Sequence, residues 1–229
     1  MKNFSLLEKK LKIKFINIQL LEQALVHRSY LNENTECKLD HNERLEFLGD
    51  AVLELVVTEY LFKHYDNPEG DLTAWRAALV NGKMLAKIAD SLKIGDFLML
   101  SRGEKKDKGR ARQYILANTF ESIIGAIYLD QGYDSSKKFI EKNVLQRLKE
   151  VLEKQLYIDA KSKFQEKAQE KTSTTPDYKV LHETGPDHDK HFTIGVYLGK
   201  KLIAKGSGAS KQSAQQSAAQ NGLDKKKWN

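Results

Sequence analysis

The stretch Asn42-Glu43-Arg44-Leu45-Glu46-Phe47-Leu48-Gly49-Asp50-Ala51-Val52-Leu53, NERLEFLGDAVL, places acidic residues inside an apolar segment. Glu46 and Asp50 are four residues apart, so they lie one above the other on one face of a helix, and Glu43 lies one turn earlier. Repelling carboxylates on a partly buried face are unfavourable unless a cation or a basic partner compensates them. The stretch therefore predicts an apolar helix, from a capping box at Asp40 and Glu43 to about Tyr65, that carries a cation site.

A second apolar helix, predicted from about Gln113 to Leu129, repeats this pattern. Asn118 and Glu121 are three residues apart, and their neighbours are Ile115, Leu116, Phe120, Ile123 and Ile124. Two helices could thus contribute oxygen ligands to one cluster. Oxygen ligands suit magnesium, manganese or calcium, and carboxylates that hold magnesium beside a phosphate are a common means of phosphodiester hydrolysis.

Two other interpretations of these acids stay open at this point. They could line a solvent-facing stripe, paired with Arg44 or Arg76, although two apolar helices and the small Gly49 beside Asp50 favour close approach and a shared site. They could also form a di-iron carboxylate bundle. That bundle uses Glu-x-x-His pairs, and no histidine of this chain lies three residues after a glutamate.

Up to Leu156 the apolar residues recur at helical spacing, and we expect five to eight helices without a strand. The first helix is predicted to begin with a capping box of Ser5 and Glu8. Residues 101–112 form a predicted loop that either contacts an anionic partner or is ordinary solvated surface. Its basic residues are Lys105, Lys106, Lys108, Arg110 and Arg112.

The periodicity changes after a short linker, and a second domain is expected. Residues 161–171 are predicted to form a helix, and residues 178–183, 192–198 and 201–205 to form strands. Ser210 is a natural N-cap for a last helix that runs to Asn221, in which Ala214 and Ala218 offer a small-residue face to the sheet.

The chain of 229 residues carries a formal net charge of +7, with a pI near 9.2, which suggests an anionic partner. From Tyr157 onward there are thirteen lysines and no arginine against eight acidic residues, so the second domain is the more basic. Cys37 is the only cysteine, which excludes an internal disulfide and a thiolate metal cage. With no secretion signal and no membrane-length apolar run, we expect a cytoplasmic protein that binds nucleic acid and no membrane.

The stretch NERLEFLGDAVL resembles the signature of the ribonuclease III family. Further segments agree in order: His27-Arg28-Ser29-Tyr30, Arg76-Ala77-Ala78-Leu79-Val80, and ILANTFESIIGAIYLDQG at residues 115–132. The C-terminal part, with Gly206-Ser207-Gly208-Ala209-Ser210-Lys211 leading into Ala218-Ala219, is similar to a double-stranded-RNA-binding domain. The resemblance implies an all-α catalytic domain at residues 1–156, a linker at 157–160, and an α+β (α-β-β-β-α) RNA-binding domain at 161–229.

The family resemblance further implies a homodimeric, magnesium-dependent endonuclease, with manganese as a plausible substitute. It would hydrolyse both strands of double-stranded RNA to 5′-phosphate and 3′-hydroxyl ends and process precursors of ribosomal RNA and of some messenger and transfer RNAs. Dimerisation would use apolar surface such as Phe47, Leu48 and Val52. The alternatives are a non-catalytic RNA-binding regulator, to which Asn118 gives some weight, and a metal phosphohydrolase acting on small phosphates.

Carried over by motif position, Glu46 and Glu121 would be metal ligands. Asp50 would be a catalytic carboxylate close to the metal and the water, Glu121 would serve in both roles, and Glu43 would support the ligands from outside the metal shell. The family's remaining acidic ligand falls at Asn118, which departs from the pattern by one negative charge. An amide oxygen can still coordinate, so we expect weaker magnesium binding with activity retained.

The resemblance also assigns the residues that would grip duplex RNA. Gln165 and Glu166 or Gln169 on the first helix, and His188 in the loop between the first two strands, would meet successive minor grooves. Lys211 at the start of the last helix would face the intervening phosphates. Gln212 and Gln215 stand where further basic residues often occur, which predicts modest phosphate affinity. His27 is expected to be structural and not catalytic.

Overall fold

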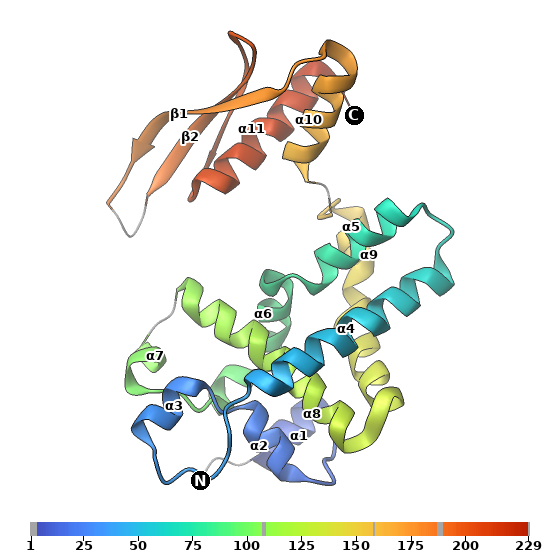
Figure 1. Ribbon diagram of the computed structural model, residues 1–229, viewed down its shortest axis with the longest axis vertical. Coiled ribbons are helices and arrows are strands. Elements are labelled where there is room, and N and C mark those ends of the chain that lie inside the picture. Colours follow the sequence, from blue (N-terminus) through green and yellow to red (C-terminus); the bar gives the residue numbers. More distant parts are fainter. Residues whose placement is uncertain (1–3, 107–108, 158, 187–189, 229) are drawn as a thin grey trace. The chain divides into compact units, whose positions relative to one another are not determined.

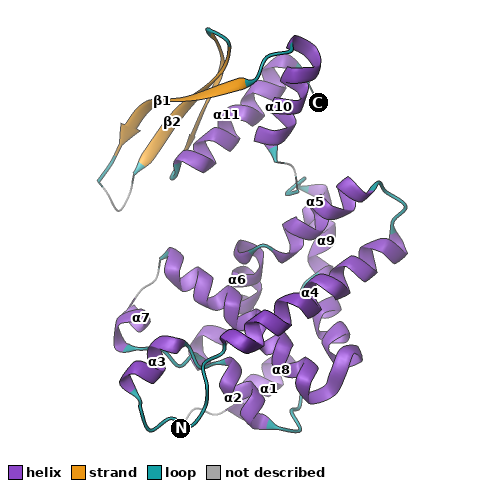
Figure 2. Cartoon of the chain, viewed as in Figure 1, coloured by secondary structure: helices purple, strands orange, loops and turns teal. Residues whose placement is uncertain are grey.

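The computed structural model describes residues 4–106, 109–157, 159–186 and 190–228. The chain divides into two compact units, Met1–Tyr157 and Ile158–Asn229, and each is described by itself. Figures 1 and 2 show that the first unit is built of helices and the second of a small sheet with two helices. This is the fold class expected from the sequence.

The first unit contains nine α-helices among its described residues, against the five to eight expected, because short helices such as α3 and α7 interrupt the connections. An isolated bridge pairs Val26 with Met99. The elements in chain order are α1 (Phe4–Leu11), α2 (Ile18–Ala24), α3 (Arg28–Glu33), α4 (Glu43–His64), α5 (Glu69–Val80), α6 (Gly82–Ser91), the 3-10 helix η1 (Ile94–Phe97), α7 (Arg102–Lys106), α8 (Arg110–Asn143), the 3-10 helix η2 (Leu145–Arg147) and α9 (Leu148–Glu153).

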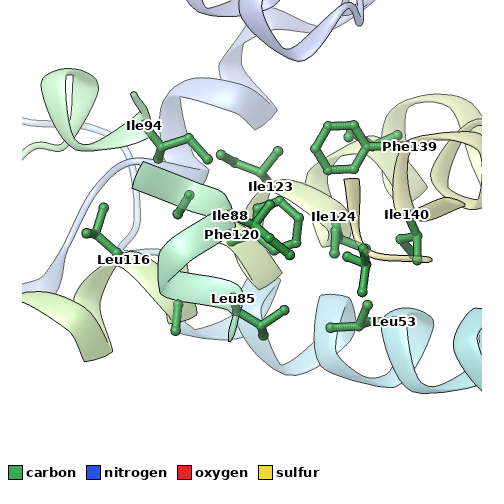
Figure 3. Close-up of a cluster of buried hydrophobic side chains, with 14 of the residues drawn as sticks. Leu53, Leu85, Ile88, Ile94, Leu116, Phe120, Ile123, Ile124, Phe139 and Ile140 are labelled. Carbon is green, nitrogen blue, oxygen red and sulfur yellow. The ribbon is translucent and has the colours of Figure 1, made fainter. Parts of the chain in front are cut away.

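Helices α4 and α8 form the centre of the first unit and make its most extensive helix–helix contact. Their backbones touch at two glycines: a Cβ atom on Gly49 would lie 1.8 Å from the carbonyl oxygen of Glu121, and one on Gly125 would lie 2.2 Å from that of Leu45. Figure 3 shows Phe120 and Ile123 of α8 among side chains of neighbouring helices, in a core that also includes Leu53 of α4. This packing fixes one helix against the other.

Both predicted capping boxes in this unit are wrong. Ser5 lies inside α1, and α4 begins at Glu43, after Asp40, with no side-chain cap from Asn42. Tertiary hydrogen bonds hold this segment instead, because Asn42 donates from its backbone to Val26 and from its side chain to the carbonyl of Ala24.

The second apolar helix is longer than expected. It begins at Arg110, so the predicted loop at residues 101–112 contains α7 and the first turn of α8. It then continues to Asn143 across a break at Gly132, whose φ of 77° lies in the region that favours glycine. Helix α8 is therefore kinked at Gly132.

The second unit has the order α10 (Ala160–Thr172), β1 (Pro176–Thr184), β2 (His191–Leu198), β3 (Lys201–Gly208) and α11 (Lys211–Lys226). The strands form an antiparallel sheet in the order β1-β2-β3, and α10 and α11 pack together over it (Figure 2). Ser210 caps α11 in a capping box with Ser213, and Ala214 and Ala218 are fully buried, as predicted. In the part of the chain described, no helix is both long and apolar enough to span a bilayer.

Candidate active site

The contact between α4 and α8 brings together the acidic residues that the sequence singled out. Glu46 accepts a hydrogen bond from the side chain of Asn118, which joins the two helices directly. Glu121 lies close enough to Asp50 and Glu46 for their negative charges to act on it. Gly49 makes this possible, because it lets the backbone of α4 approach the carbonyl of Glu121 with no side chain between them.

The electrostatics of this cluster disfavour several negative charges at once. Burial, followed by the charges of Asp50 and Glu46, raises the pKa of Glu121 to about 8. Burial also raises the pKa of Glu46 and outweighs the hydrogen bond from Asn118, which lowers it; the charges of Glu43 and Asp50 add smaller upward contributions. A cation bound among these carboxylates would relieve both perturbations.

The donor set fits a hard divalent cation such as Mg²⁺ or Mn²⁺, because it offers three carboxylates and one amide, all with oxygen ligands. Within the residues described, no three histidine, cysteine, aspartate or glutamate side chains are already arranged to hold a metal ion. Mg²⁺ characteristically retains several waters and takes phosphate oxygens as ligands, so it needs no complete protein cage. Asn118, water and substrate phosphate would complete the shell.

A cavity of about 310 Å³ opens beside this cluster and makes Glu46 and Asn118 accessible. Glu43 lines the same cavity and is ion-paired with Arg28, so it is held to one side of Glu46. Neither Arg44 nor Arg76 forms an ion pair with Glu46, Asp50 or Glu121 among the described residues, and Arg76 pairs with Glu54 instead. The stripe of acids is therefore not neutralised in the way that the simpler interpretation required.

His27 and Glu104 also line this cavity. His27 is the N-cap of α3, where its Nδ1 accepts from the backbone of Ser29, and burial lowers its pKa. The structural role expected for His27 agrees with this. The sequence did not predict a place for Glu104 in this cavity, because Glu104 lies within a segment rich in lysine and arginine. Its one indication in the sequence is that it is an acidic residue shortly before the helix of Asn118.

The second unit carries the residues assigned to RNA binding. Gln165, Glu166 and Gln169 are exposed on α10, on the side away from the buried Phe164. Lys211 is exposed in the first turn of α11, with its Nζ 5.7 Å from the centre of the Phe192 ring.

Two further residues of the second unit bear on the RNA binding predicted from the sequence. His188 lies outside the residues that the structure describes. Gln215 accepts a hydrogen bond of 2.9 Å from Lys161, so its side chain links α11 to α10.

Exposed apolar side chains gather on α4 and α8 in the first unit. Phe47 is 81% exposed, and it lines a cavity of about 670 Å³ together with Leu48 and Leu129. Val52 is only 6% exposed, so its expected place on an apolar surface is wrong. Positions 47 and 52 are five residues apart and therefore point to different sides of α4.

The comparisons with known proteins agree in both parts of the chain. Residues 17–148 match a Ribonuclease-III-like family model, and residues 160–226 match the double-stranded RNA binding motif. The chain is 45% identical to Ribonuclease 3 of Desulforamulus reducens over 94% of this chain and 88% of that protein, and 44% identical to Ribonuclease 3 of Protochlamydia amoebophila over 96% and 90%.

A solved structure of the nuclease domain of ribonuclease III from Campylobacter jejuni is 48% identical, with a TM-score of 0.55, over 62% of this chain and 98% of that one. Family models together cover nearly the whole chain, with full-length relatives well above 30% identity. The chain is a member of the ribonuclease III family.

Proposed function

We propose that this protein is a magnesium-dependent endoribonuclease that hydrolyses phosphodiester bonds in double-stranded RNA, leaving 5′-phosphate and 3′-hydroxyl ends. The observation that carries the proposal is the clustering of Glu46, Asp50 and Glu121, from two apolar helices, on a chain that also carries a double-stranded-RNA-binding fold. A pure RNA-binding protein has no need for mutually repelling acids next to a polyanion.

Glu46 and Glu121 would hold the metal with Asn118, and Mn²⁺ would be a workable substitute. The chemistry that the cation would supply is polarisation of the scissile phosphate and a lowered pKa of a water molecule. Asp50 is exposed beside the cluster, where its carboxylate would accept a hydrogen bond from the attacking water and orient it. The water oxygen would join the phosphorus as the bond to O3′ breaks, and a proton of the water would pass by way of solvent to O3′, which leaves as the hydroxyl.

The second unit would grip the duplex by shape through 2′-hydroxyls and phosphates over roughly 16 base pairs. Gln165, Gln169 and His188 would meet the minor grooves and Lys211 the phosphates. A homodimer would place two such sites on opposite strands. The exposed Phe47 supports a second copy as the partner, and the Campylobacter jejuni nuclease domain is itself described as having a region involved in dimer formation.

The substrates would be precursors of ribosomal RNA and of some messenger and transfer RNAs in the cytoplasm. Incubation of the purified chain with long duplex RNA, with Mg²⁺ or with a chelator, tests the activity. Mg²⁺-dependent conversion to short duplexes is expected, and Glu121→Gln is expected to retain RNA binding while losing cleavage.

Other outcomes would contradict the assignment. Binding without cleavage by the unmodified chain would favour a regulator, and hydrolysis of small phosphate esters alone would favour a phosphohydrolase. Robust cutting by Glu121→Gln would remove the proposed active site.

A further inference from the structure

A second polar cavity of the first unit lies between α6, η1, α7 and α8 and shares no residue with the cavity beside Glu46 and Asn118. Its volume is about 640 Å³, within the range of small-molecule sites. We call it the basic pocket, because five cationic and only two acidic side chains line it: Lys83, Lys87, Lys93, Lys105 and Arg112, with Asp90 and Asp96. The buried side chains of Ala86 and Leu116 also line it.

Arg112 is the best-placed donor in the basic pocket. Its Nη2 donates a hydrogen bond of 3.0 Å to the carbonyl oxygen of Gly95, which fixes the guanidinium. A Cβ on Gly95 would lie 3.0 Å from that same nitrogen, so the glycine gives the guanidinium room. The other terminal nitrogen, Nη1, is buried without a hydrogen-bond partner in the described residues. A buried donor without a partner is unfavourable, so any adjustment of the side chain that gave Nη1 an acceptor would be favoured.

Most lysines of the basic pocket are also available for a ligand. Lys87 pairs with Glu150 at 3.3 Å. Over the residues described, Lys83, Lys93 and Lys105 form no ion pair within 4.0 Å. Five cationic and two acidic side chains leave the lining with an excess of positive charge, and a bound polyanion would reduce the repulsion among the cations.

The short helix α7 separates the two cavities. Glu104 lines the cavity beside Glu46, whereas its neighbour Lys105 lines the basic pocket. A phosphate in the basic pocket is therefore not the scissile phosphate next to the carboxylates.

We infer that the basic pocket binds the phosphate groups of a compact, multiply charged phosphoanion such as pyrophosphate or the phosphate chain of a nucleotide. The guanidinium of Arg112 would donate a charge-assisted hydrogen bond to a phosphate oxygen, and the lysines would provide point charges. The backbone of RNA is the other possible source of phosphate groups for this pocket. Several cations that line one pocket match a ligand with concentrated negative charge better than they match a backbone with one charge per phosphate.

Isothermal titration of the full chain with pyrophosphate, in EDTA so that no metal links it to the carboxylates, tests the inference. The unmodified chain is expected to bind it at one site, and Arg112→Gln is expected to raise the Kd by about tenfold or more through loss of charge-assisted hydrogen bonds. Arg112→Lys should restore only part of the affinity. The double variant Lys83→Gln/Lys105→Gln replaces two exposed lysines and should also weaken pyrophosphate binding. This second test does not depend on a partly buried arginine.

Lys9→Gln/Lys149→Gln is the matched control, with the same loss of charge at exposed helical positions outside the pocket, and its affinity should not change. The same proteins are titrated with duplex RNA in EDTA. No saturable binding of pyrophosphate, or an equal loss in the control, would overturn the inference. The inference would also be overturned if the pocket variants lost affinity for duplex RNA while they still bound pyrophosphate, because the pocket would then be a contact for the RNA backbone.

Discussion

Replacing Glu121 with glutamine should make the metal-free protein more stable at alkaline pH while abolishing cleavage. The carboxyl group ionises near 4.5 in an unfolded chain, and its pKa in the folded protein is about 8 because of burial and the charges of Asp50 and Glu46. Between these two pH values the folded state holds a proton that the unfolded state has released. The free energy of unfolding therefore falls as the pH rises from 4.5 to 8 and levels off above 8.

The size of this fall follows from the two pKa values. At 1.36 kcal/mol per pH unit, the interval between 4.5 and about 8 corresponds to at most ~5 kcal/mol. Glu121 keeps partial contact with water, so we expect roughly 2–4 kcal/mol. Glutamine has nearly the same shape as glutamate but no charge to desolvate. The free energy of unfolding of Glu121→Gln should therefore not show this fall with pH.

Urea denaturation in EDTA at pH 5, 7 and 9 measures the effect. Unfolding is monitored by the fluorescence of Trp75 in a Trp228→Phe background, so that only the first unit is observed. The unmodified chain should lose stability towards pH 9 more steeply than Glu121→Gln, and Mg²⁺ should restore it in the unmodified chain alone. The same pH dependence in both proteins would mean that burial and the neighbouring charges do not oppose the ionisation of Glu121.

Three further predictions concern the helix crossing, the metal and the RNA. Gly49→Ala should destabilise the first unit by roughly 1–3 kcal/mol or more and abolish cleavage, because the new Cβ would clash with the backbone of Glu121. Gly70→Ala is the control: its Cβ would meet nothing within 4 Å, so cleavage should stay intact in the same assays. Asn118→Asp should reach half-maximal cleavage at a lower Mg²⁺ concentration; a requirement for equal or more metal would contradict the charge argument. Lys211→Gln should weaken duplex RNA binding and reduce its salt slope by about one, and an unchanged slope in salt titrations would remove Lys211 from the phosphate contacts.

The sequence predicted the fold class and the acidic cluster because the signals are local. Carboxylates at helical spacing inside apolar runs are visible in a single segment, and Gly49 next to Asp50 suggested the close approach that the structure contains. The strands of the second unit were located for the same reason, although each is longer than predicted.

Features that depend on distant partners were not predictable in this way. Gly125 contacts the backbone of Leu45, and nothing in its own neighbourhood indicates which helix it meets. The capping box at Asp40 failed because Asn42 is held by Ala24 and Val26, residues far earlier in the chain. The basic pocket likewise draws on four separate elements, so no single stretch of sequence reveals it.

In the proposed active site, carboxylates of α4 and α8 bind one divalent metal ion together. Anomalous diffraction from crystals grown with Mn²⁺ measures this most directly. We predict a manganese peak within bonding distance of Glu46 and Glu121, next to Asp50, that disappears in Glu121→Gln. A peak elsewhere, or one that persists unchanged in that variant, would mean that Glu46 and Glu121 do not share a metal ion.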